Sequence, residues 1–286
     1  MSDELTPSEQ PMIEEEPGRA TIGEQLAEVE PNPEAEMKRI SRRSFIWAGM
    51  ATMAGLGFIR WIATSPETDG LPAVLRKGLQ LNESVWKGMY STERLAPTYP
   101  DSEITPNPKV NGIGIPEKEI SRDDYLLVID GSSVAPKPDA QVGNDGRPAL
   151  TIDFDELQTY SKTEMTTKFC CVEGWSQVIK WAGVPLAEIV MKYPPADPKA
   201  EWIYMETMEG DYYVAIDMKS AMHPQTLLAF EMNGQPLPHN HGGPLRLVIP
   251  SKYGIKNIKW VGVMRYTAER PDDYWGERGY DWYAGL

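Results

Sequence analysis

The sequence predicts an α+β fold that is rich in strands and contains only a few short helices. The 286 residues include 25 prolines and 24 glycines, which indicates many turns and argues against a helical bundle. From about residue 121 onward, short apolar runs with the composition of strands are separated by turn signals. Strands therefore outnumber helices in this part of the chain, as is typical of α+β proteins.

Charge divides the N-terminal part of the chain. Residues 1–37 carry 11 acidic residues and one arginine. Such an acidic, proline-bearing segment cannot bury enough apolar surface to offset its chain entropy, so we expect it to be disordered. Residues 38–64 carry five basic residues and no acidic one. The rest of the chain has a net charge of −9 within a total of −14, which argues against nucleic acid as a partner.

Residues 38–64 have the order of an export signal, with basic residues ahead of an apolar run. The run Phe45–Ile59 has 15 residues, fewer than the ~20 of a membrane-spanning helix. Extended to Ala63 it has 19, with Arg60 reaching toward the far interface. The stretch SRRSFI at 41–46 resembles the twin-arginine export consensus. We therefore expect a periplasmic, extracytoplasmic protein; a buried helix with a basic cap is the alternative.

The sequence at the end of this signal is compatible with cleavage of the signal and with its retention. Trp61 stands where a cleavage site prefers a small residue, so the signal is either cleaved or kept as an N-terminal membrane anchor. An anchor with positive-inside orientation would leave the acidic tail in the cytoplasm. The resemblance to twin-arginine signals also implies export of a folded protein, often one that already holds a cofactor.

Residues 65–120 contain many loop signals and few periodic runs. A segment of this length is too long for an ordinary connection, so we expect it to wrap the domain or to line a site. Within it, Leu81–Tyr90 is expected to form one or two helical turns.

Residues 121–286 form the predicted β-rich domain. Helices are expected from Asp155 and Glu156 onward and after Pro185 within Trp181–Tyr193, since acidic residues and proline suit the first turn. Glu209-Gly210 and Asn233-Gly234 predict hairpin turns. The predicted strands are Tyr125–Asp130, Leu150–Phe154, Trp202–Met208, Tyr212–Ile216, Leu227–Met232, Leu245–Ile249 and Ile258–Arg265.

The chain has only two cysteines, Cys170 and Cys171. Neighbouring cysteines are badly placed for a disulfide, and two thiolates exclude a four-cysteine zinc or iron–sulfur site. No C-x-x-C-H motif for covalent haem attachment occurs. The Cys171 thiolate is a soft ligand that suits a redox metal, with the other ligands supplied by imidazoles or by an organic cofactor. A small buried side chain is the alternative interpretation.

Histidines and cations cluster late in the chain. His239 and His241 lie in a turn-rich loop and, with Cys171, are candidate ligands for copper or iron, whereas His223 is expected to be a hydrogen-bonded turn residue. Two glycines followed by Arg246 and a lysine-bearing turn predict a phosphate cradle. Solvated surface charge is the alternative for the lysines of that turn, Lys252, Lys256 and Lys259.

Several separated motifs carry a resemblance to a known family. They are CVEGWS with the following WAGVPL, then AMHPQTLL, then NGQPLP with GGPLRLVIPSKYGIKNIKWV, and finally YTAERP. In this order they resemble the molybdopterin domain of the sulfite oxidase family, and most closely its bacterial branch of periplasmic methionine-sulfoxide reductases. The resemblance implies a sulfite-oxidase-type molybdopterin-binding fold over residues 121–286.

The resemblance also implies roles for individual residues. Cys171 would be the catalytic molybdenum ligand, and the dithiolene of molybdopterin and oxo oxygens would complete the metal site. Cys170 would be incidental or lie behind that ligand. The other residues implied to contact the cofactor are Asn82, Trp86, Thr207, His241, Arg246, Asn257, Ile258 and Lys259.

The implied activity is oxygen-atom transfer by a molybdenum oxidoreductase, in the direction that reduces S-oxides such as methionine sulfoxide. Electrons would come from a separate carrier, for which a membrane b-type cytochrome is usual in the family. Glu173 is a candidate to tune the Cys171 thiolate or relay a proton, with a surface acid as the alternative. A sulfite dehydrogenase and a non-catalytic subunit of a membrane redox complex are the rival functions. A copper carrier fails on order, because about 70 residues separate Cys171 from the late histidines.

Overall fold

The computed structural model describes residues 33–112, 115–116, 118–135, 141–142 and 148–286. It contains two compact units, Met1–Ala63 and Thr64–Leu286. Most of the expected acidic tail lies outside the described residues, and its last residues, 33–37, belong to the first helix.

The described part of the first unit is one helix, α2 (Pro33–Ala63, 31 residues). The predicted apolar run is therefore helical. Residues Arg43–Ala63, 21 in number, are long and apolar enough to cross a membrane, because 21 residues at 1.5 Å each span about 30 Å.

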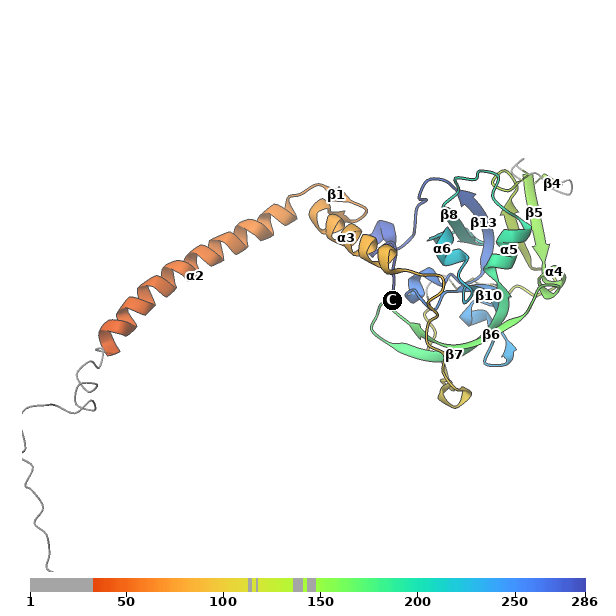
Figure 1. The fold of residues 1–286 in the computed structure, drawn as a ribbon, viewed down its shortest axis with the longest axis horizontal. Helices are drawn as coiled ribbons and strands as arrows, with labels where there is room; N and C mark the ends of the chain where they lie inside the picture. The colour runs from red at the N-terminus through yellow and green to blue at the C-terminus, as the bar shows by residue number, and fades with distance from the viewer. Residues whose placement is uncertain (1–32, 113–114, 117, 136–140, 143–147) are drawn as a thin grey trace, which may run out of the picture. The chain divides into compact units, whose positions relative to one another are not determined.

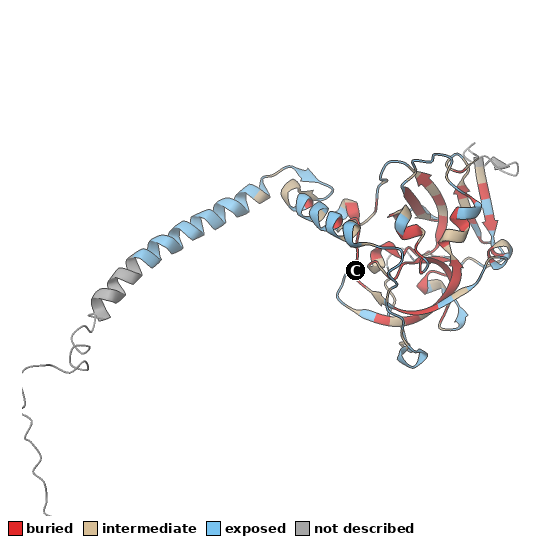
Figure 2. Ribbon diagram, viewed as in Figure 1, coloured by how far each residue is buried: buried red, intermediate tan, exposed pale blue. Residues whose placement is uncertain are grey.

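The second unit begins with a short hairpin and a helix. The hairpin pairs β1 (Glu67–Thr68) with β2 (Leu71–Pro72), and α3 (Ala73–Met89) follows directly. The helical turns predicted at Leu81–Tyr90 are present within α3, but the extension of this helix back to Ala73 was not predicted. The reason is an inverted burial pattern: Arg76 and Glu83 are buried while apolar side chains of the helix are exposed (Figure 2).

Two sheets make up the rest of this unit (Figure 1). All strand pairs are antiparallel except β3 with β13, which is parallel. The six-stranded sheet has the order β4 (Gln141–Val142), β5 (Pro148–Asp153), β3 (Leu126–Asp130), β13 (Val261–Thr267), β8 (Trp202–Thr207) and β9 (Tyr213–Asp217). The five-stranded sheet has the order β11 (Gln235–Pro236), β10 (Leu227–Met232), β7 (Ser176–Pro185) and β6 (Thr163–Cys170), and β12 (Arg246–Val248) also pairs with β10.

The helices of this unit after α3 are short. Asp153 and Asp217 cap two of them, because each carboxylate accepts a hydrogen bond from a backbone amide in the first turn. The α-helices are α4 (Phe154–Gln158), α5 (Leu186–Lys192) and α6 (Met218–Ala221). The 3₁₀ turns are η1 (Asp101–Glu103), η2 (His239–His241), η3 (Gly254–Lys256) and η4 (Gly276–Arg278). The α+β class predicted from the sequence is confirmed.

The main core is made from strands of both sheets. Leu127 and Ile129 of β3, Val184 of β7 and Phe230 of β10 belong to one buried cluster. Each of the seven predicted strands has a counterpart in the structure. The helix predicted after Pro185 is confirmed as α5, which begins at Leu186. The β6–β7 hairpin was missed, and the residues before this helix lie in β7.

Candidate active site

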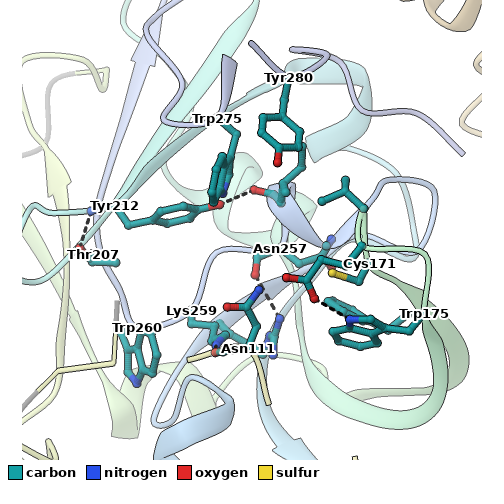
Figure 3. A pocket seen from close by; sticks show the side chains of 16 residues that line it. Asn111, Cys171, Trp175, Thr207, Tyr212, Asn257, Lys259, Trp260, Trp275 and Tyr280 are labelled. Atoms are coloured by element: carbon teal, nitrogen blue, oxygen red, sulfur yellow. Dashed lines mark hydrogen bonds between the residues drawn. The ribbon is translucent and has the colours of Figure 1, made fainter. Parts of the chain in front are cut away.

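A pocket opens beside the turn that joins β6 to β7. Its interior has a volume of about 110 Å³. Five separated parts of the chain contribute to it, and Figure 3 shows side chains from each of them. Its lining is Asn111, Phe169, Cys171, Val172, Glu173, Trp175, Thr207, Tyr212, Arg246, Gly254, Ile255, Asn257, Lys259, Trp260, Trp275 and Tyr280.

Cys171 is the first residue of the β6–β7 turn. Its amide donates to the carbonyl oxygen of Trp175 (2.9 Å), and its own carbonyl accepts from the amide of Gly174 (3.1 Å). Gly174 has a φ of 86°, a left-handed conformation that suits glycine. The turn therefore fixes the thiol at the pocket wall, where it is 8% exposed.

Burial raises the pKa of the Cys171 thiol; a backbone hydrogen bond involving Glu173 opposes this, and the charge of Glu173 adds to it. The Glu173 carboxylate itself is exposed and accepts a hydrogen bond from Trp175 Nε1 (2.7 Å). A metal at this position would have to displace the thiol proton, since thiolate is the ligand form. The neighbouring Cys170 lines a different cavity, together with Tyr99 and Lys168.

Two cations lie in the pocket wall, of which Arg246 is buried and Lys259 is half-buried. The Arg246 guanidinium donates to the carbonyl oxygens of His241 (2.8 Å) and Asn257 (3.1 Å), while its buried Nε has no hydrogen-bond partner among the described residues. Burial lowers the pKa of Arg246 to about 9. Lys259 Nζ donates to the carbonyl oxygen of Asn111 (2.5 Å), and burial, then the charge of Arg246, lowers the pKa of Lys259 to about 7.

The other predicted contacts near this pocket differ in how they face it. Thr207 and Asn257 line it, and Thr207 Oγ1 donates to Asp211 (2.7 Å) while Asn257 Oδ1 accepts from the amide of Ile249 (2.7 Å). Ile258 is buried in the main core instead.

His241 lies in a small adjoining cavity that also touches Arg246 and Lys259. Burial, together with these two cations, lowers the pKa of His241 to about 4. The imidazole is therefore neutral at pH 7. Among the described residues, no group of three or more His, Cys, Asp and Glu side chains is arranged to hold a metal ion.

Two of the predicted contact residues lie away from the pocket. Asn82 donates a hydrogen bond to Asp281, and Trp86 packs against Gly285 and borders the cavity of Cys170. The structure brings Asn111 to the pocket instead. The local sequence around Asn82 did not reveal this, because α3 turns those side chains toward the C-terminal segment.

Two lysines of the predicted cradle also have other roles. Lys256 forms a buried ion pair with Asp273 (2.5 Å), and Lys252 donates to the carbonyl oxygen of Tyr283 (3.0 Å). Only Lys259 of that turn lines the pocket. His223 accepts from the amide of Gln225 (3.1 Å), so its interpretation as a hydrogen-bonded turn residue is confirmed.

Sequence reasoning missed the aromatic walls of the pocket. Tyr212 donates to the carbonyl oxygen of Ile255 (2.6 Å), and the rings of Trp275 and Tyr280 pack edge to face with centroids 4.9 Å apart (Figure 3). These rings come from loops without periodicity. The only sequence signal was the concentration of aromatics near the C-terminus.

The comparison with known families identifies the protein family in which this pocket occurs. Residues 117–275, more than half of the chain, match the oxidoreductase molybdopterin binding domain. The chain belongs to this family. It is therefore a molybdenum-dependent oxidoreductase whose cofactor is Mo-molybdopterin.

Proteins of the same family give consistent similarities. The candidate protein-methionine-sulfoxide reductase subunit YedZ1 of Azospira oryzae is 33% identical over 86% of this chain and 88% of its own length. The protein-methionine-sulfoxide reductase catalytic subunit MsrP of Pseudomonas syringae pv. tomato is 27% identical over 86% of this chain and 78% of its own length. Among solved structures, the sulfane dehydrogenase SoxCD of Paracoccus pantotrophus has a TM-score of 0.45 at 24% identity, covering 54% of this chain and 40% of the other.

The residues of the pocket fit such a cofactor. A buried thiol meets the need for a soft metal ligand. Arg246 is buried and Lys259 is half-buried, and the described pocket lining offers them no carboxylate other than exposed Glu173. Charge that is removed from water requires a partner of opposite sign. The phosphate of molybdopterin is such a partner, and aromatic walls suit a planar pterin.

Proposed function

We propose that this chain reduces S-oxides of the methionine-sulfoxide type by oxygen-atom transfer. The observation that carries the proposal is the placement of Cys171 at the wall of a pocket that also holds buried Arg246 and half-buried Lys259, with Glu173 as the one carboxylate among the described lining residues. Cys171 is proposed as the molybdenum ligand, and Arg246 and Lys259 as the groups that bind the cofactor phosphate. The cofactor supplies the two-electron chemistry, and the protein binds, orients and shields the reacting groups.

The lining near Cys171 favours a neutral substrate. Val172, Trp175, Trp275 and Tyr280 are uncharged, and Glu173 is acidic. Sulfite is a dianion and would be repelled by Glu173, whereas a sulfoxide is neutral and presents apolar substituents to aromatic rings. The names of the YedZ1 and MsrP relatives support the same substrate class.

Electron supply and location are part of the proposal. The chain encodes no haem-attachment motif, so electrons come from a separate carrier, for which we propose a membrane b-type cytochrome. The helical stretch Arg43–Ala63 and the SRRSFI motif support export by the twin-arginine route and anchoring at the outer face of the membrane. The protein would then act in the periplasm beside its electron donor.

The test uses full-length protein purified from a membrane fraction. The expected result is about one molybdenum per chain, together with reduction of dimethyl sulfoxide and methionine sulfoxide by a reduced viologen dye. Cys171→Ser is expected to abolish both metal and activity. Sulfite oxidation without sulfoxide reduction would favour the dehydrogenase, and molybdenum-loaded protein without either activity would favour a non-catalytic subunit.

A further inference from the structure

A hairpin at the start of the second unit packs against the loop that carries two residues of the pocket rim. Trp275 and Tyr280 line the pocket, and η4 lies between them (Figure 3). A Cβ added at Gly70, in the β1–β2 turn, would lie 2.8 Å from the carbonyl oxygen of Glu277. One added at Gly279 would lie 3.1 Å from Leu71 Cγ. The two turns are therefore packed at backbone distance.

One buried guanidinium joins these two turns. Arg76, at the start of α3, is 5% exposed and donates to the carbonyl oxygens of Gly276 (2.6 Å) and Tyr280 (3.1 Å). On the hairpin side it donates to the carbonyl oxygens of Thr68 (3.4 Å) and Asp69. Arginine alone among side chains offers five donors in a rigid fork, which suits binding to several carbonyls at once.

The two carbonyls that Arg76 binds lie at the ends of the rim loop. Gly276 directly follows Trp275, and Tyr280 is itself a rim residue. The amide of Tyr280 donates to the carbonyl oxygen of Trp275 (3.0 Å), which closes the loop between them. Loss of Arg76 would leave both carbonyls without their buried donor, and the loop would have to open to reach water. The two rings would move with it.

We infer that Arg76 and the β1–β2 hairpin position the aromatic rim, and thereby determine which sulfoxides enter the site. Arg76 does not line the pocket, so it acts through Trp275 and Tyr280 as a positioning residue. The inference rests on the proposed function for its substrate. A small sulfoxide can bind with few contacts to the rim, whereas binding of a methionine sulfoxide within a peptide depends on contacts with the rim.

The experiment compares Arg76→Met with Arg270→Met in the full-length, molybdenum-loaded enzyme. Arg270 is a matched control, because it also ties α3 to the C-terminal segment through Glu83 (3.1 Å) but is not bonded to the rim loop. For Arg76→Met, we expect the KM of a methionine-sulfoxide peptide to rise about ten-fold, the factor for loss of one charge-assisted hydrogen bond. The KM of dimethyl sulfoxide, both kcat values and the molybdenum content are expected to stay within two-fold of wild type.

A second variant and a second measurement separate positioning from folding. Gly279→Ala keeps Arg76 but adds a methyl group against Leu71 at a φ of 90°, so it is expected to give the same selective rise in KM. Hydrogen exchange of the Tyr280 amide is expected to be faster in both variants than in Arg270→Met. Equal exchange and equal KM in all three variants would overturn the inference. Failure of the wild type to reduce any sulfoxide would overturn the proposed function, while the exchange experiment would still test the positioning role.

Discussion

Replacing Asp273 with asparagine tests how the fold tolerates a buried charge that has lost its partner. Asp273 Oδ2 lies 2.5 Å from Lys256 Nζ, and both side chains are 1% exposed. The same carboxylate accepts from the amides of Ala215 (3.0 Å) and Gly276 (3.0 Å). Asp273→Asn leaves Lys256 as a buried charge without its counter-ion. Breaking a buried pair in this way costs about 3–5 kcal/mol, so we expect that loss in the free energy of unfolding at pH 7.

The pH dependence follows from the lysine. Burial lowers the pKa of Lys256 from its usual 10.5, against the opposing charge of Asp273. Between the folded pKa and 10.5 the unfolded chain binds more protons than the folded one, so stability rises with pH. Without Asp273 the folded pKa falls further. The deficit of the variant is therefore expected to shrink between pH 7 and pH 9, by at most about 1.4 kcal/mol per pH unit.

The measurement is urea unfolding of wild type and variant at both pH values. Comparing the two proteins at each pH cancels the titration of groups that they share. Glu231→Gln, which breaks an exposed pair with Lys162, is the control and should cost less than about 1 kcal/mol. Adding Lys256→Met to Asp273→Asn should remove the pH-dependent part. A deficit of the same size at pH 7 and pH 9 would refute the reasoning.

Three further outcomes are expected. Cys171→Ser should lose molybdenum while Cys170→Ser retains at least half of it, by mass spectrometry of metal per chain; equal loss would contradict the assignment. Lys259→Met should weaken cofactor retention about ten- to a hundred-fold in dialysis at pH 6. Because the pKa of Lys259 is lowered to about 7, the wild-type advantage should decline above that pH, and a constant advantage would argue against phosphate binding by this lysine. Gly254→Ala should lower Tm by about 2–10 °C, because its Cβ would lie 2.4 Å from Phe169 Cζ; an unchanged Tm would show that the ring moves freely.

Apolar strands were predictable from the sequence even where both faces are buried, as in β8 and β10, whereas the polar strand β6 was missed. In β6 (Thr163–Cys170), three consecutive residues are buried, among them Thr166 and Thr167. Neither alternation nor apolar composition marks such a strand. The full length of helix α3 was not predicted for a related reason, because the buried side of the helix carries the charged residues Arg76 and Glu83. Tertiary hydrogen bonds, which the sequence does not display, stabilise both elements.

The residues of the site were predictable where the chemical type of the side chain and the family motif pointed to the same position. Cys171, Thr207, Arg246, Asn257 and Lys259 were predicted together, and they line one pocket. Asn82 and Trp86 were matched by local similarity alone, and the chain path places them elsewhere. The aromatic rim depends on loops whose positions are set by distant partners such as Arg76. The sequence of those loops contains no pattern from which the contact with Arg76 could be predicted.

The lysines of residues 252–259 show how the fold separates structural charge from charge that is available to a ligand. Lys252 lies 3.6 Å from Asp217, and Lys256 lies 2.5 Å from Asp273, so each has a carboxylate nearby. Lys259 instead donates to a backbone carbonyl and lies close enough to Arg246 for the two charges to repel. Two like charges held together at a partly buried wall oppose folding unless an anion joins them. Cofactor binding should therefore stabilise the protein by mass action.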